Sequence, residues 1–186
     1  MGAVVEAPDW KKDNRCGHGL HGWLFGQGNH DCSGTVGDAD AKWLVVEVGL
    51  SDLIALGGKV KFPRCTIRHI GNRASATQFL IANEPRAAGV AVIGATLQAG
   101  DKELCQVGAY GTATAGDEGT ATAGYKGTAT AGYKGTATAG EKGEIRIRYW
   151  DEKTERYRTV IGYIGEDGLE PNVPYKLSAG RKLVRA

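Results

Sequence analysis

An octapeptide that recurs without gaps from Gly111 to Lys142, as GTATAGDE, GTATAGYK, GTATAGYK and GTATAGEK, limits the fold of this chain more than any other feature. A tandem repeat this regular indicates one structural unit stacked on copies of itself, and a period of eight residues predicts a β-solenoid. Each unit has four strand-type residues, spanning roughly 13 Å, between glycines that allow tight turns. One unit is too short to close a coil, so we expect two units, about 16 residues, per coil.

The imperfect repeats on either side indicate which face of each strand points inward. Counted in eights from Gly111, the third and fifth places hold Leu97, Ala99, Cys105 and Val107 before the repeats, and Ile145 and Ile147 after them. Because alternate residues of a strand point to opposite faces, these places should line the interior, with Leu104 as an exception. The repeats would then bury Ala113, Ala115, Ala121, Ala123, Ala129, Ala131, Ala137 and Ala139. A flexible low-complexity linker is the alternative that the composition alone would allow.

The same register places threonines on the outside of the coil and sorts the turn residues into columns. A residue should stack on its equivalent 16 places away, so Lys102, Glu118 and Lys134 would form one column of alternating charge. Tyr125 and Tyr133 fall on opposite edges, each leaving an exposed aromatic ring, and tyrosines are enriched at interfaces. A homodimer that forms at one of these two edges is therefore one expected assembly. The candidate binding and assembly residues are Thr112, Thr114, Thr120, Thr122, Tyr125, Thr128, Thr130, Tyr133, Thr136 and Thr138.

The flanking segments complete a mainly β fold in three parts. Residues 1–86 predict a small N-terminal α+β module, residues 87–143 the two-sided β-solenoid, and residues 144–186 a C-terminal β-hairpin cap. A cap is expected because a bare solenoid end is a template for strand addition. Within the first part the patterns predict strands at 41–48, 59–62 and 65–70, helical turns at 51–56 capped by Ser51, and a helix at 72–83 that packs Ala76, Phe79, Leu80 and Ala82. Residues 87–94 should be a strand entering the solenoid, and residues 144–150 and 156–164 the two strands of the hairpin.

Reactive residue types concentrate between Cys16 and Asp40. Cys16, His18, His21, His30 and Cys32 could supply ligands to zinc, although their spacing matches no familiar zinc-finger pattern. A Gly-rich loop with packed aromatic residues and backbone-bonded histidines is the simpler interpretation. A third reading is a small nucleotide-handling enzyme, because the GLHG segment resembles short His-Gly motifs of ADP-ribosyl transferases, which would make His18 or His21 an acid-base or orienting group. We expect no cofactor under the simpler interpretation.

Composition narrows the classes of partner and compartment. The net charge of +2 predicts no strong field for nucleic acid, so nucleic-acid binding is not expected. The sequence has no run of about 20 apolar residues and no signal-peptide core near residue 1, which indicates no membrane partner and a cytoplasmic location in the cell that makes it. In that compartment the four cysteines should be thiols.

The segment from Ala123 to Ala131, AGYKGTATA, resembles the octapeptide of bacterial ice nucleation proteins. The resemblance implies a β-solenoid whose outward Thr-x-Thr rows order water and whose neighbouring copies pair. Thr128 and Thr130 match the family's strand threonines, while Lys126 replaces a glycine of the family's pattern. An ice-binding or water-ordering role is therefore one expected function.

The whole layout, with GLHGW and KWLVVEV before the octads and GEIRIRYW after them, is similar to proteins of phages and prophages. That resemblance implies an accessory phage protein acting in the host cytoplasm, for which inhibition of a host defence protein by surface binding is a reasonable analogy. The leading expectation is thus a non-enzymatic binding or assembly protein with a protein partner. The enzyme or zinc module and the ice-binding role are its alternatives.

Overall fold

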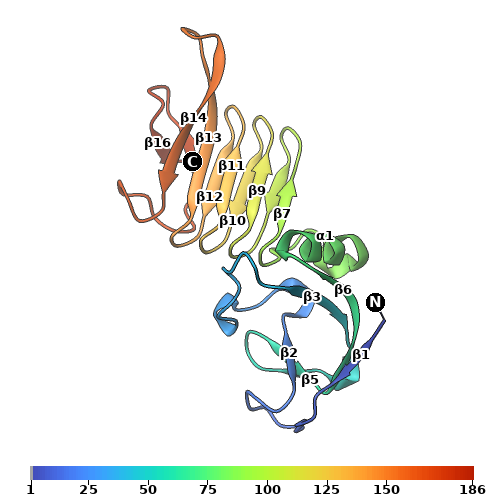
Figure 1. The fold of residues 1–186 in the computed structure, drawn as a ribbon. Coiled ribbons are helices and arrows are strands. Elements are labelled where there is room, and N and C mark those ends of the chain that lie inside the picture. The colour runs from blue at the N-terminus through green and yellow to red at the C-terminus, as the bar shows by residue number, and fades with distance from the viewer. Residues whose placement is uncertain (1) are drawn as a thin grey trace. The chain divides into compact units, whose positions relative to one another are not determined.

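The computed structural model describes residues 2–186, which form two compact units, one ending at Ala88 and the other running from Gly89 to Ala186. Two small antiparallel sheets build the first unit (Figure 1). One sheet has the order β1 (Val4–Glu6), β6 (Arg64–Gly71), β3 (Trp43–Glu47), and the other β2 (Leu20–Gly22), β5 (Val60–Phe62), β4 (Ile54–Ala55). Four short 3-10 helices connect the described strands at Leu24–Gly26, His30–Cys32, Leu50–Asp52 and Pro85–Ala87.

The predicted helix of the first unit is confirmed as α1 (Arg73–Asn83). Asn72 caps it, because its side-chain oxygen accepts a 2.9 Å hydrogen bond from the Ser75 amide. The helix packs on β3 and β6 and buries Ala76 and Thr77. Ala82 is exposed, so its assignment to the packed side was wrong, and the buried Thr77 replaces it by donating its hydroxyl to the Arg73 carbonyl at 2.9 Å.

Two other local predictions in the first unit need correction. In place of the helical turns predicted at residues 51–56 there is one 3-10 turn, Leu50–Asp52. It begins after Gly49, and no side chain caps it. Ile54 and Ala55 instead form β4 and pair with β5, because pairing satisfies their backbone groups beside an apolar cluster of Val60, Phe62 and Cys65. The strands β1 and β2 were not anticipated, since three residues are too few to show a period.

Parallel in-register strands form the solenoid of the second unit. One sheet contains β7 (Thr96–Gln98), β9 (Thr112–Ala115) and β11 (Thr128–Ala131), and the other β8 (Leu104–Gln106), β10 (Thr120–Ala123) and β12 (Thr136–Ala139). Thr112 pairs with Thr128, and Thr120 with Thr136, so each coil advances 16 residues. The prediction of two octapeptides per coil is confirmed, and Figure 1 shows the coils stacked in order.

The interior between the two sheets is as narrow as the sequence indicated. The eight repeat alanines are at most 3% exposed, and Ile145 and Ile147 close one end of their column with 0% exposure. The turn glycines are required by the distance between coils, because a Cβ built on Gly132 would lie 2.6 Å from the backbone nitrogen of Asp117. The last residue of each octad adopts the left-handed conformation without being glycine, with φ of 57° at Lys134.

The predicted hairpin is confirmed and extends one sheet of the solenoid. β13 (Glu144–Asp151) pairs in parallel with β11 and in antiparallel with β14 (Arg156–Tyr163), while β15 (Tyr175–Leu177) and β16 (Leu183–Arg185) extend the other sheet beyond β12. The strand predicted at 87–94 is wrong. This segment is irregular, and it buries Val92 and Ile93 while Gly94 donates its amide to the Ala109 carbonyl at 2.8 Å.

The predicted fold class is therefore confirmed as mainly β, with a small N-terminal α+β part, a two-sided solenoid and C-terminal strands. The finer division at residues 86/87 and 143/144 stays a prediction. Within residues 2–186, no helix combines the length and apolar character that crossing a bilayer requires.

Enlarging an interior methyl group should destabilise the solenoid, because coil spacing leaves no room for more carbon atoms. We predict that Ala129→Leu lowers the free energy of unfolding by about 1–3 kcal/mol, since Ala129 is 0% exposed and pairs with Ala113 and Ile145. Thr130→Val on the outer face should change it by no more than about 0.5 kcal/mol. Urea denaturation of both variants tests this, and equal stability of the two would contradict the assignment of inner and outer faces.

Candidate functional site

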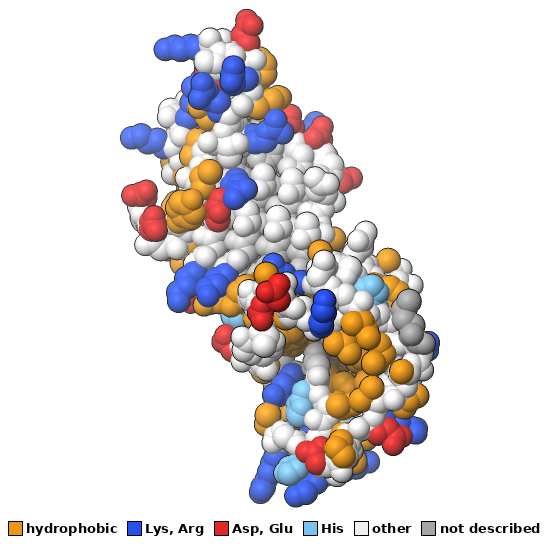
Figure 2. Space-filling model, viewed as in Figure 1, with side chains coloured by type: hydrophobic (Ala, Val, Ile, Leu, Met, Phe, Trp, Pro, Cys, Tyr) orange, Lys and Arg blue, Asp and Glu red, His pale blue; other side chains and the backbone are white. Residues whose placement is uncertain are grey.

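The outward faces of the solenoid carry threonines in straight columns. On one sheet the columns are Thr96, Thr112, Thr128 and Gln98, Thr114, Thr130. On the other they are Leu104, Thr120, Thr136 and Gln106, Thr122, Thr138. Neighbours are spaced by roughly 4.8 Å along a column and roughly 6.8 Å along a strand. In Figure 2 the face of the solenoid turned to the viewer is largely free of charge, with Lys, Arg, Asp and Glu gathered along its margins.

The hydroxyl groups of these threonines are not used inside the protein. All eight repeat threonines are half-buried, and within residues 2–186 none of their side chains makes a hydrogen bond to another protein group. A hydroxyl in this position can donate one hydrogen bond and accept two. The two faces therefore present a regular array of methyl and hydroxyl groups whose hydrogen bonds are available to water.

The turns at the two edges of the solenoid hold the tyrosines and most of the charge. At one edge the Tyr110 and Tyr125 rings meet edge to face at 5.7 Å, with the Lys126 ammonium over both. Tyr125 is consequently half-buried, in contrast to the exposed ring we expected. At the opposite edge Tyr133 is exposed, and Lys102 lies 3.8 Å from Glu118. The contact of Lys102 with Glu118 in the predicted charge column and the placement of the tyrosines on opposite edges are confirmed, while the role of the tyrosines in assembly stays a prediction.

Carboxylates also tie successive coils together at the second edge. The Asp101 carboxylate accepts the Asp117 amide at 2.8 Å, and the Asp117 carboxylate accepts the Tyr133 amide at 2.8 Å. Each bond joins residues 16 apart and satisfies an amide that the turn would leave unpaired.

A groove of about 420 Å³ runs between this edge and the threonine column at Thr114 and Thr130. Its lining includes Arg148, whose guanidinium lies 4.4 Å from the centre of the Tyr157 ring.

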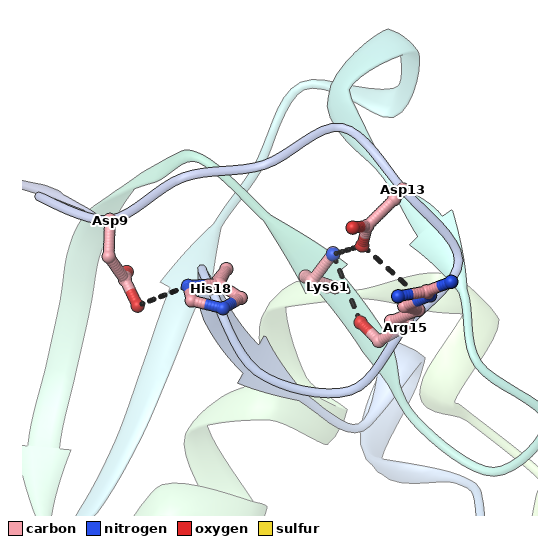
Figure 3. Close-up of polar contacts among 5 residues, drawn as sticks. All are labelled: Asp9, Asp13, Arg15, His18 and Lys61. Carbon is pink, nitrogen blue, oxygen red and sulfur yellow. Dashed lines mark hydrogen bonds and ion pairs between the residues drawn. The ribbon is translucent and has the colours of Figure 1, made fainter.

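In the N-terminal unit, a buried lysine organises the loop that contains the reactive residue types. Lys61 of β5 is 0% exposed, and its ammonium donates to the Asp13 carboxylate at 2.7 Å and to the Arg15 carbonyl at 3.0 Å (Figure 3). The hydrogen bond from Lys61, followed by one from the Arg15 amide, lowers the pKa of Asp13. Trp10 lies over the same ammonium at 5.3 Å. Sequence reasoning missed this pair, because Lys61 alternates with Val60 and Phe62 as an ordinary outward residue would.

The residues singled out between Cys16 and Cys32 are distributed along this loop. The Cys16 thiol lies 3.1 Å from the Lys59 ammonium, which lowers the pKa of Cys16. The His18 ring is 3.4 Å from the Asp9 carboxylate, and Figure 3 shows the two side chains facing each other. The pKa of His21 is lowered by burial and then by Lys59. His30 contacts the neighbouring Asp31 at 3.2 Å. Cys32 is exposed, and all four cysteines of the chain are free thiols.

This arrangement offers no formed metal site. Within residues 2–186, no three side chains of the His, Cys, Asp or Glu type lie close enough to hold a metal ion. The structure therefore does not bring Cys16, His18, His21, His30 and Cys32 together as one ligand set. It likewise places His18 on an exposed loop, with its ring 3.4 Å from the Asp9 carboxylate.

Comparison with known proteins finds similarity over part of the chain. An ice nucleation protein of Pseudomonas syringae is 40% identical over 83 residues, which is 44% of this chain and 7% of the relative. Ice nucleation proteins of Xanthomonas campestris pv. translucens and Pseudomonas fluorescens are 37% identical over 87 residues and 40% identical over 82 residues, covering 46% and 43% of this chain and 5% and 7% of the relatives. The chain thus spans a small fraction of the length of these curated relatives. No family model and no solved structure matches.

The pairing of Lys61 with Asp13 should make the stability of the N-terminal unit depend on pH. Because the pKa of Asp13 is lowered in the folded state, its ionised carboxylate stabilises the fold at pH values above the ordinary aspartate pKa of about 3.9. This stabilisation is lost as the pH falls through the lowered pKa. We predict that the melting temperature read from tryptophan fluorescence falls on acidification from about pH 5. Asp13→Asn should lower it at pH 7 and weaken this acid dependence. Asp9→Asn, which removes an exposed carboxylate, is the control, and equal behaviour of the two variants would refute the assignment.

Proposed function

We propose that the solenoid orders water and binds ice through its threonine columns. The observation that carries this proposal is the in-register array of eight threonines whose hydroxyl groups make no hydrogen bond within the described protein. The partial similarity to proteins named ice nucleation proteins supports the same reading. Water-mediated contacts are enthalpically nearly as good as direct hydrogen bonds, so a surface that holds water in register gains from each ordered molecule.

The rigidity of the face favours this function. Each threonine has a β-branched side chain with few rotamers. Its strand is paired in parallel on both sides in β9, β10 and β11, while β12 pairs in parallel with β10 and in antiparallel with β15. The alanine methyls beneath leave no space for the sheet to bend inward. The positions of the hydroxyl groups are therefore set before water arrives, and little conformational entropy is lost on binding.

The extent of the array favours binding to ice over starting its growth. Parallel columns run over three strands on one face, from Thr96 to Thr128, and over two on the other, from Thr120 to Thr136. The array ends at β13, where Glu144 and Arg146 replace the two threonines. A template of this size offers far fewer sites than the much longer relatives, of which the chain matches 5–7%. We therefore assign adsorption to an existing ice surface as the activity.

Binding of a protein partner is the second candidate function. The hairpin exposes Trp150, Tyr157 and Tyr163, and Arg148 stacks on Tyr157, a composition typical of interface hot spots. The partner would be a protein of the host cell if this chain, like the phage proteins that its layout resembles, is encoded by a phage. Capture of one protein by the wild type and not by a Tyr157→Ala variant would favour this candidate, and capture by neither would remove its support.

Charge placed in the array should abolish ice binding, because each lysine holds its own hydration shell and the two substitutions together remove two hydroxyl groups. We predict that the wild-type protein partitions into slowly growing ice and that the double variant Thr114→Lys, Thr130→Lys falls to the level of an unrelated globular protein. Lys102→Ala at the edge should retain partitioning, since it changes charge outside the array. Circular dichroism checks that each variant is folded. Exclusion of the folded wild-type protein from ice would overturn the proposal.

A further inference from the structure

The outer strand β14 is the longest open edge of the four sheets. It has eight residues, whereas β7 at the other edge of its sheet has three. The outer strands of the remaining sheets, by their order of pairing, have two to five residues: β1, β3, β2, β4, β8 and β16. Natural proteins keep edge strands short or protected because an unpaired strand invites another strand. The length of β14 therefore indicates that another strand can pair with it.

Its backbone groups alternate between the hairpin and the outside. All eight residues pair with β13 without a register shift, and the next residue, Ile164, donates its amide to the Gly143 carbonyl at 2.9 Å. In an antiparallel pair every second residue bonds to the neighbouring strand, so Gly162, Val160 and Arg158 point inward. Tyr157, Thr159 and Ile161 then direct their amides and carbonyls away from β13. Among residues 2–186 no other strand pairs with β14.

The residues of β14 are also of the kind that strands accept. Thr159, Val160 and Ile161 are β-branched, and the strand contains no proline. Seven of its eight residues are exposed or half-buried, as expected for a strand with one face and one edge in solvent. Its two arginines, Arg156 and Arg158, lie at one end, where Arg158 is already paired with Asp151 at 2.7 Å.

We propose that β14 is a dimerisation edge that pairs in antiparallel with β14 of a second copy of this chain. A two-fold axis at Val160 would place Arg158 opposite Gly162 of the partner subunit and Tyr157 opposite Tyr163 of the partner subunit. This register separates the arginine-bearing ends and brings aromatic rings together, so charge and side-chain pairing both allow self-association. The inference concerns a surface distinct from Tyr125 and Tyr133, and it stands or falls independently of ice binding.

Pairing of this kind would join two five-stranded sheets into one continuous sheet. Because the two-fold axis is perpendicular to the sheet, both copies keep the same face outward. The columns at Thr112 and Thr114 of the two subunits would then lie on a common surface, on either side of a central strip with Arg148, Tyr157 and Ile161. A dimer would thus present twice the array of one chain.

The experiment combines sedimentation velocity with hydrogen exchange on the full chain. We expect a concentration-dependent dimer, in which Thr159→Pro raises the dissociation constant at least about tenfold. Thr159→Val, which retains the outward amide, and Tyr133→Ala, which alters the solenoid edge, should leave the constant within about twofold. In wild-type protein the amides of Tyr157, Thr159 and Ile161 should exchange more slowly as concentration rises.

The hydrogen-exchange measurement keeps the proposal testable if Thr159→Pro fails to fold. A wild-type chain that stays monomeric at all concentrations would overturn the proposal. A dimer lost in Tyr133→Ala and retained in folded Thr159→Pro would overturn it as well. So would a dimer in which the three outward amides exchange as fast as in dilute protein.

Discussion

The structure of the solenoid depends on how closely two sheets and successive coils approach one another. Alanine fills every inward place of the four repeats, and all eight of these alanines are at most 3% exposed. Glycine is required where each strand enters its turn, because the backbone of the previous coil occupies the place of a Cβ. The amide of Gly132 bonds to the carbonyl of Gly116 at 3.1 Å, so the stacking of coils continues through the turns. A coil held this tightly has little freedom to twist, and its outer face is correspondingly regular.

A thin interior has an energetic consequence at the ends of the stack. A buried methyl contributes only about 0.8 kcal/mol, so most of the stabilisation per coil comes from the parallel ladder and its hydrogen bonds rather than from apolar burial. The stack needs larger side chains where the ladder stops. Ile145, Ile147, Leu169 and Tyr175 supply them at the C-terminal end, and all four are at most 8% exposed. The hairpin, which supplies Ile145 and Ile147, also moves the open edge of its sheet from a short repeat strand to the longer β14.

The repeat region was predictable from sequence because one small pattern determines register, facing and turn position together. The alternation of Leu, Val and Ile in the flanking octads was enough to assign Ala113 inward and Thr112 outward. The N-terminal unit was less predictable, because all of its strands except β6 have only two to five residues and carry almost no period. Its organising contact also joins Lys61 to Asp13 across 48 positions. The threonine array followed from the pattern, whereas the half-buried state of Tyr125 depends on Tyr110, an irregular octad residue that breaks the repeat.

The separation of charge from the threonine array follows from the same turn geometry. A charged side chain occupies the last place of each of the four repeats, and tyrosine precedes it in two of them. The left-handed backbone at Glu118 and Lys134, as at Lys102, turns these side chains away from both faces. Charge enters the face at β13, where Glu144 and Arg146 take the places of Thr128 and Thr130 and the strand continues through Arg148 without a turn. The array is thus limited to the coils whose outward strand positions hold threonine. A larger surface of the same kind requires either more octads or a second chain placed edge to edge, and the long open strand next to the array makes the second route available.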